Sequence, residues 1–153
     1  MSAWPPDFAS WLSGDACPLC AEGRPEEVGD RVRFFSSDVS DGYLHLRGVQ
    51  RGYAALIWRG RHVAEPTDLT DDEAAEFWRD LLRVGRAMQA VYKPLKMNYV
   101  MMGNRIPHLH WLLAPRFWDD VAPGDPIPAF GYHAFPEAEV RQEVAALKAI
   151  LSS

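Results

Sequence analysis

The most regular pattern in the chain is an apolar stripe between residues 70 and 94. Its apolar residues recur three or four positions apart, which is the spacing of one face of an α-helix. Thr70 and Glu73 have the spacing of a capping box, in which each side chain bonds to a backbone N–H near the helix start. Pro94 then interrupts the pattern. The sequence therefore predicts a long helix whose buried face carries Ala74, Phe77, Trp78, Leu81, Val84, Met88 and Val91.

Shorter apolar stretches bounded by turn residues predict strands. A second helical pattern covers residues 137–151, and the proline-rich segment 123–136 is expected to be a loop. Pro115 is expected to end the last strand. Neighbouring strands with one long helix between them indicate an α+β domain with an antiparallel sheet of about five strands. The predicted strands are Val32–Phe35, Tyr43–Leu46, Tyr53–Trp58, Met97–Met102 and Leu109–Leu113.

Length and composition limit the organisation of the protein. The chain has 153 residues, of which 48% are hydrophobic, so one domain with a real core is expected over residues 17–153. Residues 1–16 are expected to be an irregular N-terminal extension, because proline, glycine and serine interrupt any periodicity.

Charge and cysteine content bear on partners and compartment. The net charge of −5 argues against binding to nucleic acid by bulk charge. No apolar stretch is long enough to span a membrane, and the N-terminus lacks the basic start of a secretory signal. Two cysteines exclude a disulfide scaffold and favour a cytoplasmic protein.

Two histidines carry the first candidate chemistry. His108 and His110 are separated by one residue in a predicted strand, so their side chains project from the same side. Two imidazoles on one face can share a metal ion, or one can orient the other. The alternative is a pair of partly buried histidines with structural hydrogen bonds only.

The surroundings of these histidines resemble the signature of the histidine triad (HIT) family. The core of the resemblance is Met97–Asn104, Pro107–Trp111 and Ala114–Arg116. It implies a HIT-like fold, in which an antiparallel sheet is accompanied by one long helix and a C-terminal helix, and a homodimer. The resemblance covers roughly residues 17–120, because further pieces follow in the family's order: Cys17–Cys20, Gln50–Tyr53, Arg61–Val63 and Leu69.

The resemblance also implies a reaction. HIT enzymes attack the α-phosphate of a nucleotide derivative through a histidine, and water or a second phosphate resolves the nucleotidyl-histidine. Carried onto this sequence, His110 is the nucleophile and His108 supports it. Purine nucleotides are the implied substrates, either dinucleoside polyphosphates or AMP joined to an amine or a phosphate. The residues implied to bind the nucleotide are Asn98, Gly103, Asn104 and Arg105.

The sequence departs from the family motif at Leu112, where a third histidine is expected. Leucine cannot donate a hydrogen bond, so one source of transition-state stabilisation is missing unless Asn104 or Arg105 replaces it. The alternative hypothesis is a catalytically impaired, HIT-like nucleotide-binding protein. A third hypothesis is a zinc-stapled scaffold that acts through a partner interface.

Cys17 and Cys20 predict a metal site, because a gap of two residues lets both thiolates reach one tetrahedral ion. The resemblance implies His62 and His108 as the other two ligands of a structural zinc ion. The alternatives are a redox pair, which would favour a thioredoxin-like βαβ context that the chain lacks, or two free thiols.

Overall fold

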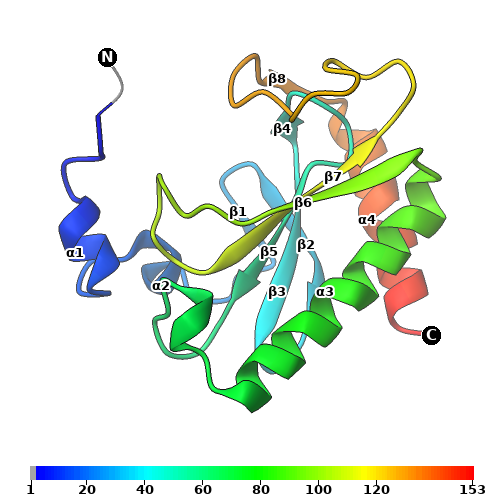
Figure 1. Cartoon of the computed structure of the whole chain (residues 1–153). Coiled ribbons are helices and arrows are strands. Elements are labelled where there is room, and N and C mark those ends of the chain that lie inside the picture. Colours follow the sequence, from blue (N-terminus) through cyan, green and yellow to red (C-terminus); the bar gives the residue numbers. More distant parts are fainter. Residues whose placement is uncertain (1–2) are drawn as a thin grey trace.

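An antiparallel sheet of six strands forms the centre of the protein (Figure 1). The structure is a computed structural model and describes residues 3–153. The strand order is β1-β2-β3-β5-β7-β6, and β4 and β8 form a separate small ladder. The strands are β1 (Glu27–Val28), β2 (Arg31–Ser36), β3 (Ser40–His45), β4 (Arg47–Gly48), β5 (Ala54–Trp58), β6 (Lys96–Val100), β7 (His110–Arg116) and β8 (His133–Ala134).

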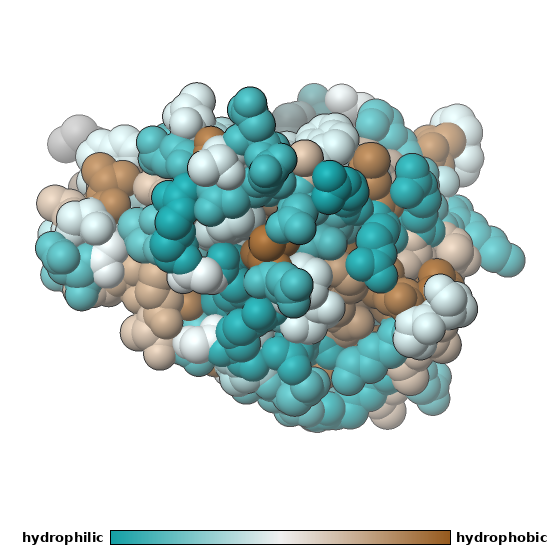
Figure 2. Space-filling model, turned by 90° about the horizontal axis from the view of Figure 1, so that it is seen from below, coloured by the Kyte–Doolittle hydropathy of each residue, from teal (hydrophilic) through white to brown (hydrophobic). Residues whose placement is uncertain are grey.

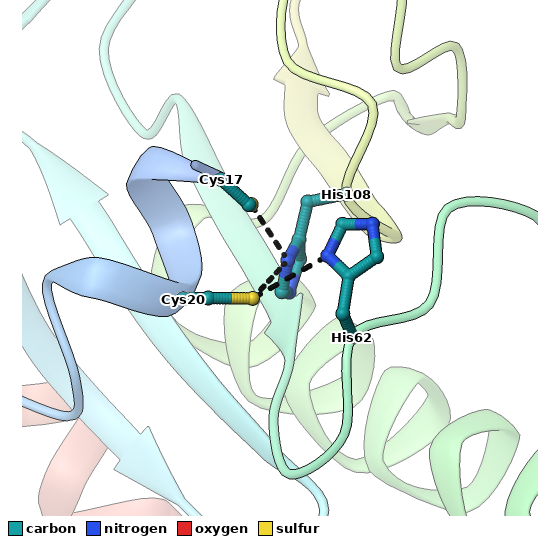
Figure 3. A group of neighbouring side chains, drawn as sticks. All are labelled: Cys17, Cys20, His62 and His108. Carbon is teal, nitrogen blue, oxygen red and sulfur yellow. Dashed lines mark hydrogen bonds between the residues drawn. The ribbon is translucent and has the colours of Figure 1, made fainter. Parts of the chain in front are cut away.

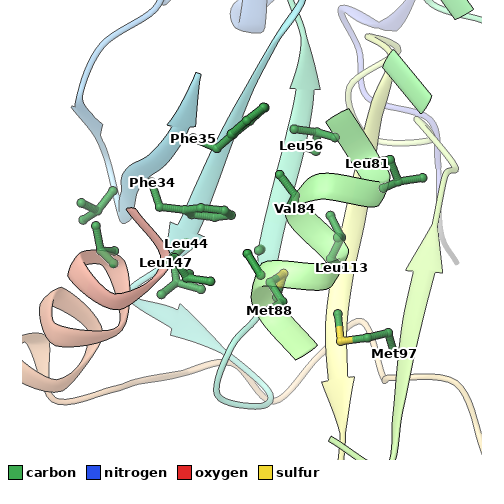
Figure 4. Close-up of a cluster of buried hydrophobic side chains, with 14 of the residues drawn as sticks. Phe34, Phe35, Leu44, Leu56, Leu81, Val84, Met88, Met97, Leu113 and Leu147 are labelled. Atoms are coloured by element: carbon green, nitrogen blue, oxygen red, sulfur yellow. The ribbon is translucent and has the colours of Figure 1, made fainter. Parts of the chain in front are cut away.

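Two long helices cover one face of this sheet. Side chains from α3 (Asp71–Tyr92) and α4 (Glu137–Leu151) pack with those of the sheet into one core cluster, part of which Figure 4 shows. Three short helices lie elsewhere in the chain: α1 (Phe8–Leu12), α2 (Pro18–Ala21) and the 3-10 helix η1 (Pro66–Asp68). The predicted α+β fold with an antiparallel sheet, one long helix and a C-terminal helix is confirmed.

The long helix begins and ends where the sequence predicts. The Thr70 side chain accepts from the Glu73 N–H at 3.2 Å, and the Glu73 carboxylate accepts from the Thr70 N–H at 2.8 Å, so the capping box is complete. Lys93 adopts a left-handed conformation just before Pro94. Within the helix, Gly85 lets Tyr99 of β6 approach, since a Cβ there would lie 2.6 Å from the tyrosine oxygen.

The two faces of the sheet have different roles. Leu44, Leu56 and Leu113 point into the core beneath the helices. Alternation along the strands therefore sends Tyr43 and Leu112 to the opposite face, where both pack in a second apolar cluster with Cys17 and Leu19. This second face, covered by the segment before β2, carries the candidate site.

Five details differ from the sequence prediction. Trp78 was expected on the buried face of the long helix, which is wrong, because its side chain is exposed. Residues 1–16 were expected to be irregular, which is wrong for α1 (Phe8–Leu12). The proline-rich loop 123–136 contains the short strand β8. Strand β1 (Glu27–Val28) lies in a polar run where no strand was expected, so the sheet has six strands rather than about five.

Pro115 does not end β7, which continues to Arg116. Pairing of β7 with β5 ends at Leu113, so beyond that residue β7 is paired only with β6. The carbonyl of Pro115 accepts from the Gln50 side chain, on the side where β5 has already ended. A missing N–H on that side therefore breaks no ladder hydrogen bond, which is the condition under which a strand tolerates proline.

The face of the protein seen in Figure 2 is mostly hydrophilic but not uniformly so. Seen from below the view of Figure 1, hydrophobic residues form separate patches among hydrophilic ones (Figure 2). Within residues 3–153, no helix is long and apolar enough to cross a membrane.

Candidate functional site: a Cys2His2 cluster beside His110

The four predicted metal ligands meet at one point (Figure 3). Cys17 and Cys20 come from the start and the body of α2, His62 from the segment after β5, and His108 from the residues just before β7. One potential ligand atom of each residue lies within 4.8 Å of the others. The structure thus brings together residues that are up to 91 positions apart in the sequence.

The donor set and its spacing suit zinc. His108 Nδ1 lies 3.4 Å from the Cys17 sulfur and 3.5 Å from the Cys20 sulfur, and His62 Nδ1 lies 3.4 Å from the Cys20 sulfur. Tetrahedral zinc with its usual bond lengths places sulfur and nitrogen ligands about 3.5 Å apart. Two thiolates and two imidazoles are also a common structural zinc set. The residues present therefore fit the metal that the resemblance implies.

Both histidines are held by backbone carbonyls through their other ring nitrogen. His108 Nε2 lies 2.7 Å from the carbonyl oxygen of Trp58, and His62 Nε2 lies 3.1 Å from that of Leu12 in α1. A carbonyl only accepts, so each Nε2 carries the proton and each Nδ1 keeps its lone pair for a metal. This arrangement around ligating histidines is typical of metal sites.

The chain runs close to His62 at Gly14. Its φ is +91°, and a Cβ there would lie 2.8 Å from the His62 ring. Only glycine satisfies both conditions without a shift of the backbone or of the ring. Gly14 therefore lets the segment between α1 and α2 lie against this ligand.

Burial changes the acidity of two members of the cluster. Desolvation lowers the pKa of His108 to about 4, so its ring is neutral at pH 7, as a metal ligand must be. Burial and the neighbouring Cys17 raise the pKa of the Cys20 thiol to about 11. Without a cation the thiol form is therefore favoured, and metal binding would release a proton from Cys20.

His110 is the first residue of β7, and a backbone carbonyl orients its ring. Nδ1 donates to the carbonyl oxygen of His108 at 2.6 Å, which leaves Nε2 unprotonated on the neutral ring. Desolvation lowers the pKa of His110, and the charges of Arg31 and His45 lower it further, although the bond to His108 opposes the shift. The neutral, nucleophilic form is therefore favoured near pH 7.

Leu112 lies on the same face of the sheet as His110, two residues along β7. It is paired with Ala55 of β5 and packs against the apolar cluster that contains Tyr43 and Ile57. The side chains that pack against Leu112 are thus mainly apolar, and Leu112 itself has no hydrogen-bond donor for a phosphoryl oxygen.

The predicted nucleotide-binding residues fall into two groups. Asn98 is taken up by another contact, since its side-chain oxygen accepts from Arg116 at 2.6 Å. Asn104 and Arg105 are exposed in the turn before His108, and within residues 3–153 neither side chain has a hydrogen bond. The assignment of Asn98, Gly103, Asn104 and Arg105 to a nucleotide stays a prediction.

A pocket of about 150 Å³ adjoins His110. It opens between the segment after His62 and the turn that contains Gly103, so of the four predicted nucleotide-binding residues only Gly103 lines it. Apolar side chains, one carboxylate and the two histidines line it. Besides His108, Leu109 and His110, its lining consists of Ala64, Glu65, Pro66, Met101, Met102 and Gly103.

Sequence reasoning missed three contributors. The contacts made by the carbonyls of Leu12 and Trp58 cannot be predicted from residue type, because every residue has a backbone carbonyl. His45 was interpreted as an ordinary histidine, yet alternation along β3 places it on the same face as Tyr43. Its Nδ1 lies 3.9 Å from Asp30, and its buried Nε2 has no partner within residues 3–153.

Comparison with known proteins agrees with this fold. The family model of the HIT domain matches residues 30–118, which is more than half of the chain. The sheet, the long helix α3 and the strand that carries His110 therefore form a HIT domain. The chain belongs to the HIT family.

One relative of known activity is similar in sequence. It is the bifunctional bis(5'-adenosyl)-triphosphatase/adenylylsulfatase FHIT of Arabidopsis thaliana, 26% identical over 120 residues. The match covers 75% of this chain and 64% of that relative, so the chain spans less than two thirds of the relative's length.

Two solved structures show the same fold. A histidine triad protein of Bradyrhizobium japonicum has a TM-score of 0.74 at 24% identity, with 80% of this chain and 91% of that chain covered. A zinc-bound histidine triad family protein of Mycobacterium smegmatis has a TM-score of 0.59 at 21% identity, with 95% and 91% covered. These likenesses establish the fold.

Proposed function

We propose that this protein is a nucleotide hydrolase or nucleotidyl transferase that acts at the α-phosphate, with His110 as the nucleophile. The observation that carries the proposal is the bond from His110 Nδ1 to the His108 carbonyl, 2.6 Å long. This bond holds the imidazole in the tautomer whose Nε2 can attack phosphorus.

The reaction would proceed in two displacements. His110 Nε2 forms a bond to phosphorus while the bond to the leaving group breaks, and the leaving group takes its electron pair. Water or a second phosphate then forms a new P–O bond as the P–N bond breaks, which returns the neutral imidazole. When water attacks, it releases one proton to the solvent. Asn104 and Arg105, exposed in the turn beside this site, are the candidates to meet the phosphoryl charge.

Purine nucleotides are the proposed substrates. The FHIT relative is named for the hydrolysis of bis(5'-adenosyl) triphosphate and of adenylyl sulfate. Both compounds present an adenylyl phosphorus with a good leaving group. We extend that substrate class, rather than either compound, to this chain.

We further propose a structural zinc ion held by Cys17, Cys20, His62 and His108. The spacing of the four ligands, the carbonyl behind each histidine and the zinc-bound relative of M. smegmatis support it. The ion would supply a cross-link between α2 and the sheet. Because His108 also provides the carbonyl that orients His110, this cross-link would stiffen the support of the nucleophile.

A catalytically impaired nucleotide-binding protein is the second candidate, and Leu112 favours it. The removal of one preorganised donor costs about 2.7–4 kcal/mol of transition-state stabilisation in other enzymes, or a hundredfold to a thousandfold in rate. If neither Asn104 nor Arg105 compensates, the site would bind nucleotide and turn it over slowly.

Mass spectrometry separates the two candidates. The protein and its His110→Ala variant would be incubated briefly with an adenosine phosphoramidate or with diadenosine tetraphosphate and analysed under denaturing conditions. An acid-labile adenylyl adduct, or AMP as product, in the wild type alone would support the enzyme. Neither adduct nor AMP, with nucleotide still raising the melting temperature, would support the binding protein. Absence of both effects would contradict both candidates.

We also propose a homodimer that pairs through β6. This strand lies at the edge of the sheet, so the backbone groups on its outer side are unpaired by strands within residues 3–153. Beside it, Trp78 and Leu82 of α3 and Tyr99 and Val100 of β6 are exposed. An antiparallel edge pairs readily with its own copy about a two-fold axis. Light scattering should give twice the chain mass, and Val100→Lys should halve it.

A cytoplasmic location is proposed from the thiols. Cys17 and Cys20 are both free, and the metal assignment needs them reduced. A reducing compartment keeps such a pair available as zinc ligands. Localisation of a tagged protein in its own cells tests this.

A further inference from the structure

Arg59 is a buried cation placed directly after β5. Its side chain is only 4% exposed. Nε donates to the Asp41 carboxylate at 2.9 Å, and Nη1 donates to the carbonyl oxygen of Leu19 at 2.9 Å. Leu19 belongs to α2 and is one of the two residues between Cys17 and Cys20. The guanidinium therefore holds the backbone between the two thiols.

The helix itself leaves this carbonyl unpaired. Helix α2 has four residues, and the backbone N–H groups of Ala21 and of the two residues after it bond to the carbonyls of Cys17, Pro18 and Cys20. The carbonyl of Leu19 receives none of these bonds. A helix this short has no stability of its own, since nucleation costs more than so few hydrogen bonds return. Contacts outside the helix must therefore keep α2 in place, and Arg59 makes one to the backbone between the thiols.

Asp41 fixes the guanidinium in turn. Its side chain is fully buried and also accepts from Arg24 at 2.8 Å and from Ser36 at 2.7 Å. Burial disfavours the charged form, but the bonds from Arg24, Ser36 and Arg59 outweigh it and hold the pKa of Asp41 below its usual value. A buried carboxylate of this kind sets the direction of Arg59.

The residue before Arg59 supports the two histidines. The carbonyl of Trp58 accepts from His108 Nε2 at 2.7 Å. The indole Nε1 of Trp58 donates at 3.1 Å to the carbonyl oxygen of Arg61, the residue before His62. Two consecutive residues at the end of β5 thus touch all three segments that carry the four predicted ligands.

We propose that Trp58 and Arg59 preorganise the metal centre, with Arg59 as the positioning residue for the Cys17–Cys20 pair. The inference rests on the zinc site proposed above. Without Arg59, α2 would lose its anchor between the thiols. Metal binding would then have to order this segment as well, which weakens affinity.

Metal affinity tests the inference. Zinc binding would be measured by competition with a chromophoric chelator, and cobalt(II) would report thiolate and imidazole ligation by its absorption. Arg59→Gln should bind zinc about tenfold to a hundredfold more weakly, as is usual when a group that supports a ligand is removed. Arg59→Lys keeps the charge, but a single ammonium does not reproduce the fork that reaches both Asp41 and Leu19, so part of the loss should remain.

Arg116 provides a matched control. Its side chain is 10% exposed, pairs with Asp120 at 2.6 Å and also bonds to backbone carbonyls, but contacts no part of the metal cluster. Arg116→Gln should lower the melting temperature of the metal-free protein, as Arg59→Gln should, and leave zinc affinity within twofold of the wild type. This comparison separates general destabilisation from loss of positioning.

Each outcome decides something. Tight zinc binding by the wild type with an equal affinity in Arg59→Gln would overturn the positioning role alone. A wild type that binds no zinc would overturn this inference and the metal assignment together. If Arg59→Gln does not fold, the result with Arg59→Lys decides in its place: an unchanged affinity overturns the role and a reduced one supports it.

Discussion

The carbonyl oxygen of His108 accepts from His110 Nδ1 at 2.6 Å, while the ring of the same His108 lies 3.4 Å from the Cys17 sulfur. One residue therefore belongs to the candidate metal cluster through its side chain and to the proposed nucleophile through its backbone. Any change that moves the cluster should reach His110 through a single peptide unit.

Removal of zinc should slow the first chemical step. With the metal stripped by a chelator, His108 loses its fixed position, and its carbonyl orients His110 less firmly. The rate of adduct formation in a single turnover should fall by about tenfold or more. Zinc should restore it, and magnesium, which prefers oxygen ligands, should not. An unchanged rate in the metal-free protein would show that the two sites are independent.

Leu112→His should increase turnover. The new imidazole would lie on the same face as His110 and supply a donor for the developing charge. We expect an increase of about a hundredfold in the rate of AMP formation if the missing donor is the main defect. Leu112→Met, which conserves volume and adds no donor, serves as the control. Equal rates in both variants would mean that Asn104 or Arg105 already fills the role.

Adduct formation should remain as fast at mildly acidic pH as at pH 7. Burial and the charges of Arg31 and His45 lower the pKa of His110, so its neutral form survives below the pH of about 6.5 at which an ordinary histidine is half protonated. The acid limb of the pH profile should therefore have its midpoint below that value. Arg31→Gln removes one of the charges and should move the midpoint upward. A midpoint above 6.5 in the wild type would contradict the assignment of the limb to His110.

Gly14→Ala should weaken metal binding. The residue has φ +91°, and the added Cβ would meet the His62 ring at 2.8 Å. Gly124 is the matched control, because its φ of +83° imposes a similar backbone strain with no atom within 4 Å of a new Cβ. Both variants should lose about 1 kcal/mol of stability. Only Gly14→Ala should lose zinc affinity, and similar affinities in the two variants would argue against a close contact at His62.

Most of the fold could be predicted from local sequence patterns. The capping box at Thr70 and the apolar stripe predicted the long helix, and short apolar stretches bounded by turn residues predicted the central strands. The short elements could not be predicted, because β1 (Glu27–Val28) and α1 (Phe8–Leu12) depend on contacts with distant parts of the chain. The prediction that Pro115 ends β7 is wrong because a strand tolerates proline where the neighbouring strand has already ended. The sequence of β7 alone does not reveal where β5 ends.

The candidate metal cluster could be assembled from residue types and the family resemblance, and the structure brings its four members together. What sequence could not provide is the support around them. The carbonyls of Leu12 and Trp58 are backbone groups. Arg59 is an arginine beside a glycine and close to a second arginine, a pattern typical of an exposed turn. A side chain that is only 4% exposed is what distinguishes Arg59, and burial is a property of the fold.

Helix α1 and helix α2 both lie outside residues 30–118, the range that the HIT family model matches. Yet Leu12 of α1 supplies the carbonyl that bonds to His62 Nε2. Cys20 lies in α2, and Cys17 immediately precedes this helix. A fragment limited to residues 30–118 would retain His110 and the carbonyl of His108 but would lack both cysteine sulfurs that lie beside the His108 ring. The smallest piece able to assemble this site is therefore larger than the piece that identifies its family.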